Sequence, residues 1–130
     1  MTYTLLANSL NALANGVKVT AWGSTANNAN AKTLRIYFES LVRTVTLTAS
    51  INGSWRLEMV LFRVSVSSQQ GQVNITETVL GAALAAPKMT QDTELAMAET
   101  LSGNITIKMT GQATTTNDIL QMGMLVEYFD

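Results

Sequence analysis

The chain contains no cysteine and no histidine among its 130 residues, and only 13% of the residues are charged. Without cysteine there can be no disulfide framework, and without either residue the usual ligands of a transition-metal site are missing. A serine or threonine nucleophile would need a base beside it, and only a lysine could take the place that histidine usually fills. We therefore expect a protein that is not an enzyme and carries no cofactor or metal.

The charges that are present are balanced and scattered. Eight basic and nine acidic residues give a net charge of −1, and they form no block of one sign. Binding to a nucleic-acid backbone requires clustered lysine and arginine, and attachment to an anionic membrane requires a basic patch. We therefore expect neither nucleic acid nor membrane as a partner.

Long apolar runs are also absent. The longest, Met59 to Phe62, is interrupted by Arg63, whereas a membrane span needs about 20 residues. The N-terminus lacks the basic and apolar regions of a secretory signal. We expect a complete gene product from Met1 to Asp130 that is made in the cytoplasm.

Apolar and polar residues alternate along much of the chain, which predicts half-buried strands. The clearest alternating runs are 17–22, 34–39, 44–48, 73–79 and 105–110. Asn15-Gly16 and Asn52-Gly53 predict tight hairpin turns because both residue types tolerate positive φ, and 81–87 is a predicted loop. About eight strands predict one all-β domain over 1–130, an antiparallel β-sandwich or jelly roll.

The segment from Gln91 to Leu101 fits two structures. Its apolar residues could line one side of a short helix, or they could face one way from a strand. We favour a strand, because the neighbouring segments are strands. On a strand Asp92 and Glu94 share a face, where a solvated edge is favoured over a pair of catalytic carboxylates.

Asparagine is concentrated at Asn27, Asn28 and Asn30. Their oxygens could bind calcium, but calcium sites usually include carboxylates. A plain turn rich in asparagine is favoured.

Two segments, 54–66 and 119–128, are apolar on both faces. A strand that is buried on both faces is covered by other parts of a protein on each side. In an antiparallel sandwich the second covered face is often a contact between subunits. We therefore expect an oligomer. The large side chains on the outward phase, and so the predicted subunit contacts, are Trp22, Tyr37, Ile119 and Leu125. Trp22 could instead be a platform for a ligand such as a sugar.

Several stretches resemble a known family. They are Ala21-Trp22-Gly23 followed by 26–35, Trp55-Arg56-Leu57-Glu58, 99–111, and 117–119 leading into 124–128. In these residues the chain is similar to a small all-β module of tailed-phage virion proteins, and the likeness covers most of 16–130.

The resemblance implies a jelly-roll-like fold, usually a homotrimer, mounted on a phage particle. Such modules occur as stand-alone capsid decoration (cement) proteins or as domains of tail and spike proteins. The chain has no attached stalk or enzymatic domain, which favours the decoration role. The expected partner is then the major capsid protein, and the expected place is the outer surface of the head. The alternative is a tail- or fibre-associated protein with a role in binding a receptor or glycan.

The first 14 residues show no settled alternation, which is typical of an arm that orders on contact. We expect this arm to face the capsid shell. Its predicted contact residues are Tyr3, Leu5, Leu6 and Leu10.

Overall fold

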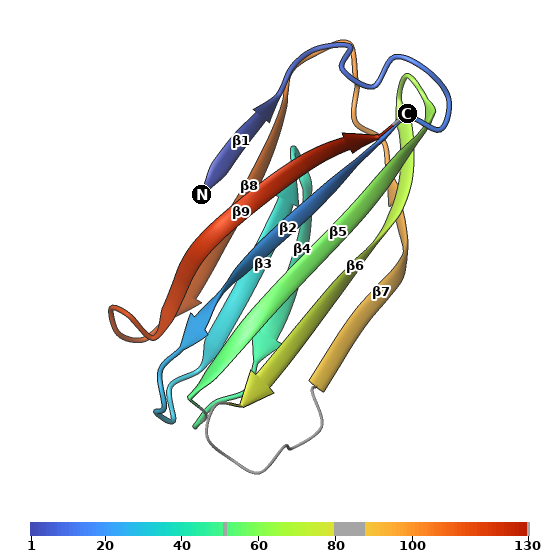
Figure 1. Cartoon of the computed structure of the whole chain (residues 1–130). Helices are drawn as coiled ribbons and strands as arrows, with labels where there is room; N and C mark the ends of the chain where they lie inside the picture. Colours follow the sequence, from blue (N-terminus) through green and yellow to red (C-terminus); the bar gives the residue numbers. More distant parts are fainter. Residues whose placement is uncertain (51, 80–87, 130) are drawn as a thin grey trace.

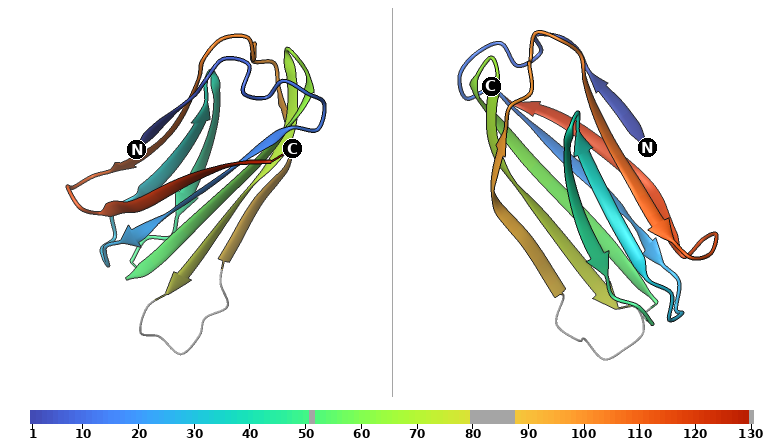
Figure 2. Two further views of the ribbon diagram at one scale, coloured as in Figure 1. Left: turned by 45° about the horizontal axis from the view of Figure 1, so that its top comes forward. Right: turned by 180° about the vertical axis from the view of Figure 1, so that it is seen from behind.

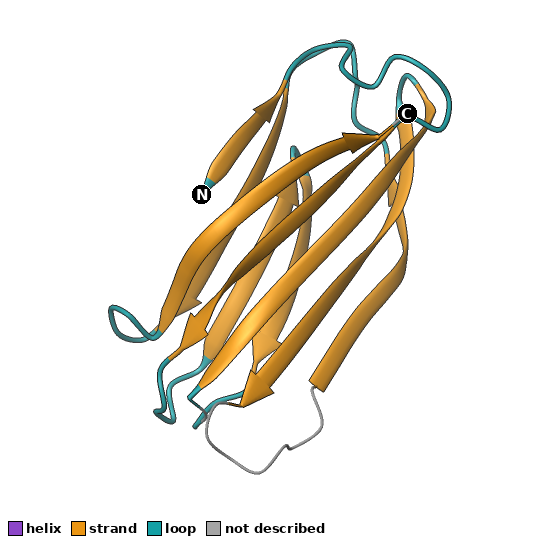
Figure 3. Cartoon of the chain, in the orientation of Figure 1, coloured by secondary structure: helices purple, strands orange, loops and turns teal. Residues whose placement is uncertain are grey.

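The computed structural model describes residues 1–50, 52–79 and 88–129, leaving the side chains of 88 and 92–95 undescribed. This part of the chain holds strands and loops and no helix (Figure 3). The strands are β1 (Thr2–Leu5), β2 (Gly16–Thr25), β3 (Lys32–Phe38), β4 (Leu41–Leu47), β5 (Gly53–Ser65), β6 (Ser68–Val79), β7 (Lys88–Met97), β8 (Ile105–Ala113) and β9 (Ile119–Phe129). The all-β prediction is confirmed.

The strands form two antiparallel sheets that pack face to face as a β-sandwich (Figures 1 and 2). The four-stranded sheet has the order β1-β8-β3-β4, and the five-stranded sheet has the order β7-β6-β5-β2-β9. The pairing of β2 with β9 and of β3 with β8 is nested, as in a jelly-roll-like winding. The β3–β4 hairpin stays within one sheet.

Alternation places the core between the sheets. In β3, Leu34, Ile36 and Phe38 are at most 2% exposed, while the residues between them face outward. Burying one such side chain stabilises the fold by about 1.5–3 kcal/mol. The other buried hydrophobic side chains are Leu5, Leu10, Val17, Val19, Ala21, Leu47, Trp55, Leu57, Met59, Leu61, Val73, Ile75, Met97, Leu101, Ile105, Ile107 and Met109.

The N-terminal segment is part of the sandwich, so the prediction of a separate arm over 1–14 is wrong. β1 pairs with β8, and Leu5 is 1% exposed and Leu10 3% exposed. The Tyr3 hydroxyl lies 2.9 Å from the Tyr128 hydroxyl of β9. The segment is ordered because its leucines complete the core and β1 covers the edge of β8.

Two of the local predictions have clear outcomes. The segment from Gln91 to Leu101 is a strand as favoured up to Met97, where β7 ends; β7 runs along β6. Asn15-Gly16 is not a hairpin turn: Gly16 begins β2, and the buried Asn15 side chain accepts a hydrogen bond from the Ala12 amide at 2.6 Å. At the other predicted hairpin turn, Asn52-Gly53, Gly53 begins β5. The preceding strand, β4, lies in the other sheet, so these two strands do not form a hairpin. The predicted loop over 81–87 lies outside the described residues.

Candidate interaction surface

The side of the five-stranded sheet that faces away from the core carries a group of exposed apolar side chains. They are Trp22 of β2, Phe62 of β5, and Leu120, Met122 and Leu125 of β9, with exposed fractions of 42%, 44%, 44%, 62% and 49%. We call these five residues the apolar face. Leu120, Met122 and Leu125 lie on the strand next to Trp22, whereas Phe62 pairs with Gly16, six positions along β2 from Trp22. Isolated exposed apolar residues are normal, but several on one side of a sheet mark a surface for interaction.

Trp22 is positioned by a glycine on the next strand. It pairs with Gly123 of β9, and a Cβ atom added at Gly123 would lie 2.2 Å from the Trp22 ring. The indole therefore lies across the β9 backbone, and only a residue without a side chain leaves room for it. The pairing register shifts at this point, leaving Met122 without a partner in β2.

A second aromatic ring, nearer the C-terminus, also lies over a glycine of the neighbouring strand. Phe129 lies over Gly16, where an added Cβ would be 2.2 Å from the ring. Phe62, on the other side of Gly16, meets Phe129 edge to face with ring centroids 4.9 Å apart. Aromatic rings that cover glycines in neighbouring strands fix register, so these exposed rings have defined positions.

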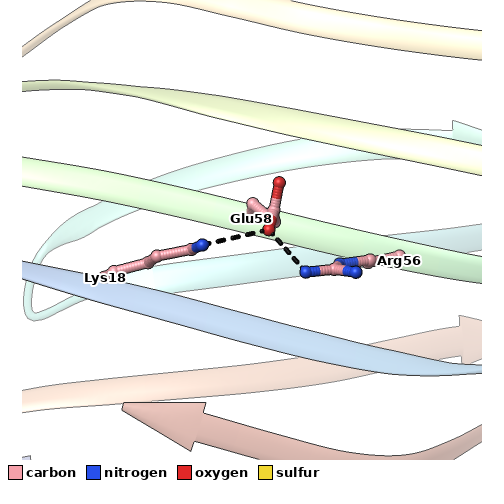
Figure 4. A network of polar contacts seen from close by, with 3 residues as sticks. All are labelled: Lys18, Arg56 and Glu58. Carbon is pink, nitrogen blue, oxygen red and sulfur yellow. Dashed lines mark hydrogen bonds and ion pairs between the residues drawn. The ribbon is translucent and has the colours of Figure 1, made fainter. Parts of the chain in front are cut away.

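Three charged residues lie next to Trp22 on the same side of the sheet. Glu58 of β5 accepts from Arg56 at 2.7 Å and lies 3.3 Å from the Lys18 ammonium of β2 (Figure 4). Partial burial raises the pKa of Glu58, but hydrogen bonds from Lys18 and Arg56 outweigh it and leave the pKa below its usual value. Glu58 is therefore ionised at neutral pH. We call these three residues the exposed triad.

Trp22 and Arg56 separate two shallow depressions. One, of about 460 Å³, is lined by Lys18, Thr20, Leu125 and Glu127 besides that pair. The other, of about 640 Å³, extends over Ser54, Thr76, Thr78 and Met122. Shallow depressions on a flat sheet suit a protein surface or a sugar better than an enclosed small molecule.

The predicted subunit contacts fall in three different places. Trp22 and Leu125 both border the smaller depression. Tyr37 lies on the opposite side of the molecule, on the four-stranded sheet, with the Lys108 ammonium 4.3 Å from its ring centroid. Ile119 is partly buried, packs against the core and lies over Gly111 of β8. The prediction that Ile119 shares the face of Leu125 is wrong, because the register shift in β9 reverses the alternation between them.

The predicted capsid contacts also separate. Leu5 and Leu10 are buried, and Tyr3 is half-buried, so only Leu6, at 64% exposed, is available at the surface. The structure corrects this set, because the two buried leucines are needed by the core.

Exposed aliphatic side chains do gather at the end of the sandwich that includes Leu6. The loop between β1 and β2, which carries Leu6, runs beside the turn between β5 and β6 (Figure 1), and the Ala14 amide of this loop donates to the Arg63 carbonyl. We call this end the apolar end; its exposed aliphatic residues are Leu6, Leu13, Val64 and Val66, at 64%, 73%, 45% and 50%. The sequence signal was present in the two-sided apolar pattern of 54–66.

The sequence did not reveal a buried charged cluster at the opposite end. Lys32 is 0% exposed and Asp118 2% exposed. The Lys32 ammonium donates to the Asn28 carbonyl, the Asn28 side-chain oxygen and the Asn30 carbonyl at 3.1, 2.8 and 3.1 Å. Asp118 accepts from the side-chain amides of Asn28 and Asn30 at 2.5 and 2.9 Å, and from Thr115. We call these residues the buried cluster.

The buried cluster is a structural device. The three protons of the Lys32 ammonium meet three oxygens, which is its full hydrogen-bonding capacity. Hydrogen bonds from Asn28, Asn30 and Thr115 hold the pKa of Asp118 far below its usual range. The asparagine-rich turn is confirmed, and the charge it surrounds is the chain's own ammonium group.

Comparison with known proteins gives no relative. No family model matches the chain, and no curated protein or solved structure matches it. Within the described residues, no helix is long and apolar enough to cross a membrane, and no three carboxylates gather to hold a metal ion.

Proposed function

We propose that this chain is a structural protein of a phage virion, a decoration (cement) protein that binds as a homotrimer to the outer surface of the head and stabilises the shell. The observation that carries the proposal is the apolar end, where four aliphatic side chains are exposed on loops and on the end of β5, and backbone hydrogen bonds join these segments. A rigid sandwich with one apolar end is suited to docking on another protein. The resemblance to phage virion modules supplies the identity of that protein.

The mechanism follows from multiple attachment. Three equivalent apolar ends in one trimer would bind the shell together, so modest individual contacts add up to strong overall attachment. A decoration trimer that bridges neighbouring capsid subunits resists their separation. Because the contacts are apolar, attachment should change little with salt.

The experiment is binding to purified heads of the phage that encodes this chain. We expect wild-type protein to sediment with the heads, and Leu13→Asp to bind about tenfold or more weakly, since a charge would be placed in an apolar contact. Thr44→Asp is the matched control and should bind normally, because Thr44 is exposed on β4 of the four-stranded sheet and is not part of the apolar end. Absence of wild-type binding, or equal binding by Leu13→Asp, would contradict the proposal.

A second function is favoured by one observation: the exposed indole of Trp22 lies beside the hydrogen-bonding groups of Arg56 and Glu58. A sugar ring stacks on such an indole while its hydroxyls bond to charged side chains. A tail- or fibre-associated protein would use this surface for a host glycan. Binding on a glycan array that disappears in Trp22→Ala would support it, and an array without binding would oppose it.

A further inference from the structure

We propose that the apolar face of the five-stranded sheet binds a second copy of this chain. The inference deepens the proposed function, because it names the surface that each subunit would present to its neighbour. In a trimer this surface binds a different surface of the neighbouring copy. It depends on that proposal only for the number of subunits. The face itself, its charges and its rigidity are properties of the described sandwich.

The exposed area of the apolar face fits a contact between copies. From their exposed fractions of 42–62%, its five side chains present roughly 450 Å² of surface, which is within the range of about 300–600 Å² for the largest apolar patches on monomeric proteins, and such patches are often functional. A specific interface buries about 800 Å² on each partner. The apolar face and the charged residues around it can supply an area of that order.

The residue types on the apolar face are those of an interface. Interfaces between proteins are enriched in aromatic residues, methionine and arginine, and their strongest contacts come from tryptophan, tyrosine and arginine. Trp22, Phe62 and Met122 lie on this face, and Arg56 borders both depressions beside Trp22. A central tryptophan with a charged rim is the arrangement such contacts need.

The charges around the apolar face balance. Lys18 and Arg56 are matched by Glu58 and Glu127 around the depressions beside Trp22. A face with a single sign of charge would select a partner of the opposite charge, whereas two charges of each sign suit a chain whose own net charge is only −1. The occupant best suited to a face that is apolar in the middle and neutral overall is therefore another copy.

Two of the aromatic rings on the apolar face have fixed positions. Trp22 is fixed over Gly123, and Phe62 is fixed against Phe129. Side chains that are already ordered lose little freedom on association, which lowers the entropic cost of binding.

The opposite face offers a natural control. Its outward side chains are mostly threonines, namely Thr2, Thr4, Thr33, Thr44, Thr46, Thr106 and Thr110. Apart from Val42 and Tyr37, this threonine surface has few of the large apolar groups that dominate interfaces.

The experiment is the solution mass, measured by sedimentation over a concentration series. We expect the wild-type chain to have a multiple of its 14.0 kDa subunit mass. Leu125→Glu should shift the protein to the single-chain mass, and Thr46→Glu, the same substitution on the threonine face, should leave the oligomer intact. A wild-type protein that stays a single chain at every concentration, or a Leu125→Glu protein that still associates, would overturn the inference.

Fluorescence provides a second measurement that does not depend on a disruptive variant. The chain has two tryptophans, of which Trp55 is 2% exposed and Trp22 42% exposed. Acrylamide should quench the wild-type emission more at low concentration, where association is lost and Trp22 is uncovered. Trp22→Phe leaves only Trp55 and should show no such concentration dependence. Quenching that is the same at all concentrations would count against the inference.

The two proposals fail in different ways. If the chain is an oligomer that does not bind phage heads, the further inference stands and the decoration role fails. If the chain binds heads as a single chain, the decoration role stands and the inference of a second copy fails. If it is a single chain whose glycan binding depends on Trp22, the face belongs to a sugar and the inference of a second copy is overturned.

Discussion

Two groups of charged residues in this protein have similar compositions and opposite surroundings. The buried cluster joins Lys32 to Asp118 through Asn28 and Asn30, and both charged side chains are at most 2% exposed. In the exposed triad, the side chains of Lys18, Glu58 and Arg56 are 36%, 33% and 59% exposed.

The surroundings of a charged group, more than its residue type, therefore set its role. A buried ammonium or carboxylate must have every hydrogen bond satisfied, because an unpaired buried charge is very costly. An exposed ion pair contributes little to stability because water competes for it. We infer that the buried cluster holds two loops together, while the exposed triad is free to meet a partner.

Removal of the buried ammonium should cost the most stability. In Lys32→Met three buried oxygens lose their donor, so the free energy of unfolding should fall by about 3–5 kcal/mol. Lys18→Met, the same substitution in the exposed triad, should change it by about 1 kcal/mol or less. Urea denaturation measures both. Similar losses in the two variants would remove the distinction between the clusters.

The next effect is acid sensitivity. The pKa of Asp118 is lowered in the folded protein, so the ionised form stabilises the fold fully above the unfolded value of about 3.9, and this stability is lost as the pH falls below it. Melting temperatures between pH 2 and 7 should therefore drop below about pH 4. Asp118→Asn, which cannot titrate, should be less stable at pH 7 and show a shallower drop. If its drop were as steep as that of the wild type, another group would be responsible.

The smallest effect is expected in the exposed triad. Glu58→Gln removes one ion-pair partner from Lys18 and Arg56 and should cost about 1 kcal/mol or less. The cost should shrink further in 1 M salt, where exposed charges are screened over about 3 Å. Urea denaturation with and without salt tests this. A free-energy cost that is large and independent of salt would mean that the exposed triad contributes to stability as the buried cluster does.

The fold was predictable because alternation is a local signal. The residues of β3 that alternate as Leu34, Ile36 and Phe38 face the core as their pattern indicates. The role of Gly16 as the first residue of β2, in place of the predicted turn, was not predictable in the same way. Gly16 is needed beneath the ring of Phe129, and no local sequence shows which aromatic side chain will arrive from the far end of the chain.

The site was predictable only in part, for reasons that are equally physical. Trp22 lies on the outward phase of a regular strand, so its exposure follows from the alternation. Ile119 was misplaced because one extra residue in β9 reverses the phase. Lys32 is in phase with the buried residues of β3, and that signal could have indicated its burial. The position of Asp118, 86 residues further along, carried no such sign.

The contact between Trp22 and Gly123 has a consequence for how this sequence can change over time. A side chain at position 123 cannot coexist with the indole where it lies. A larger side chain at position 123 therefore requires a smaller one at position 22. Relatives of this chain should therefore vary at the two positions together, with the large ring carried by one strand or by its neighbour. Such covariation would be a record of the pairing of β2 with β9, readable from sequences alone.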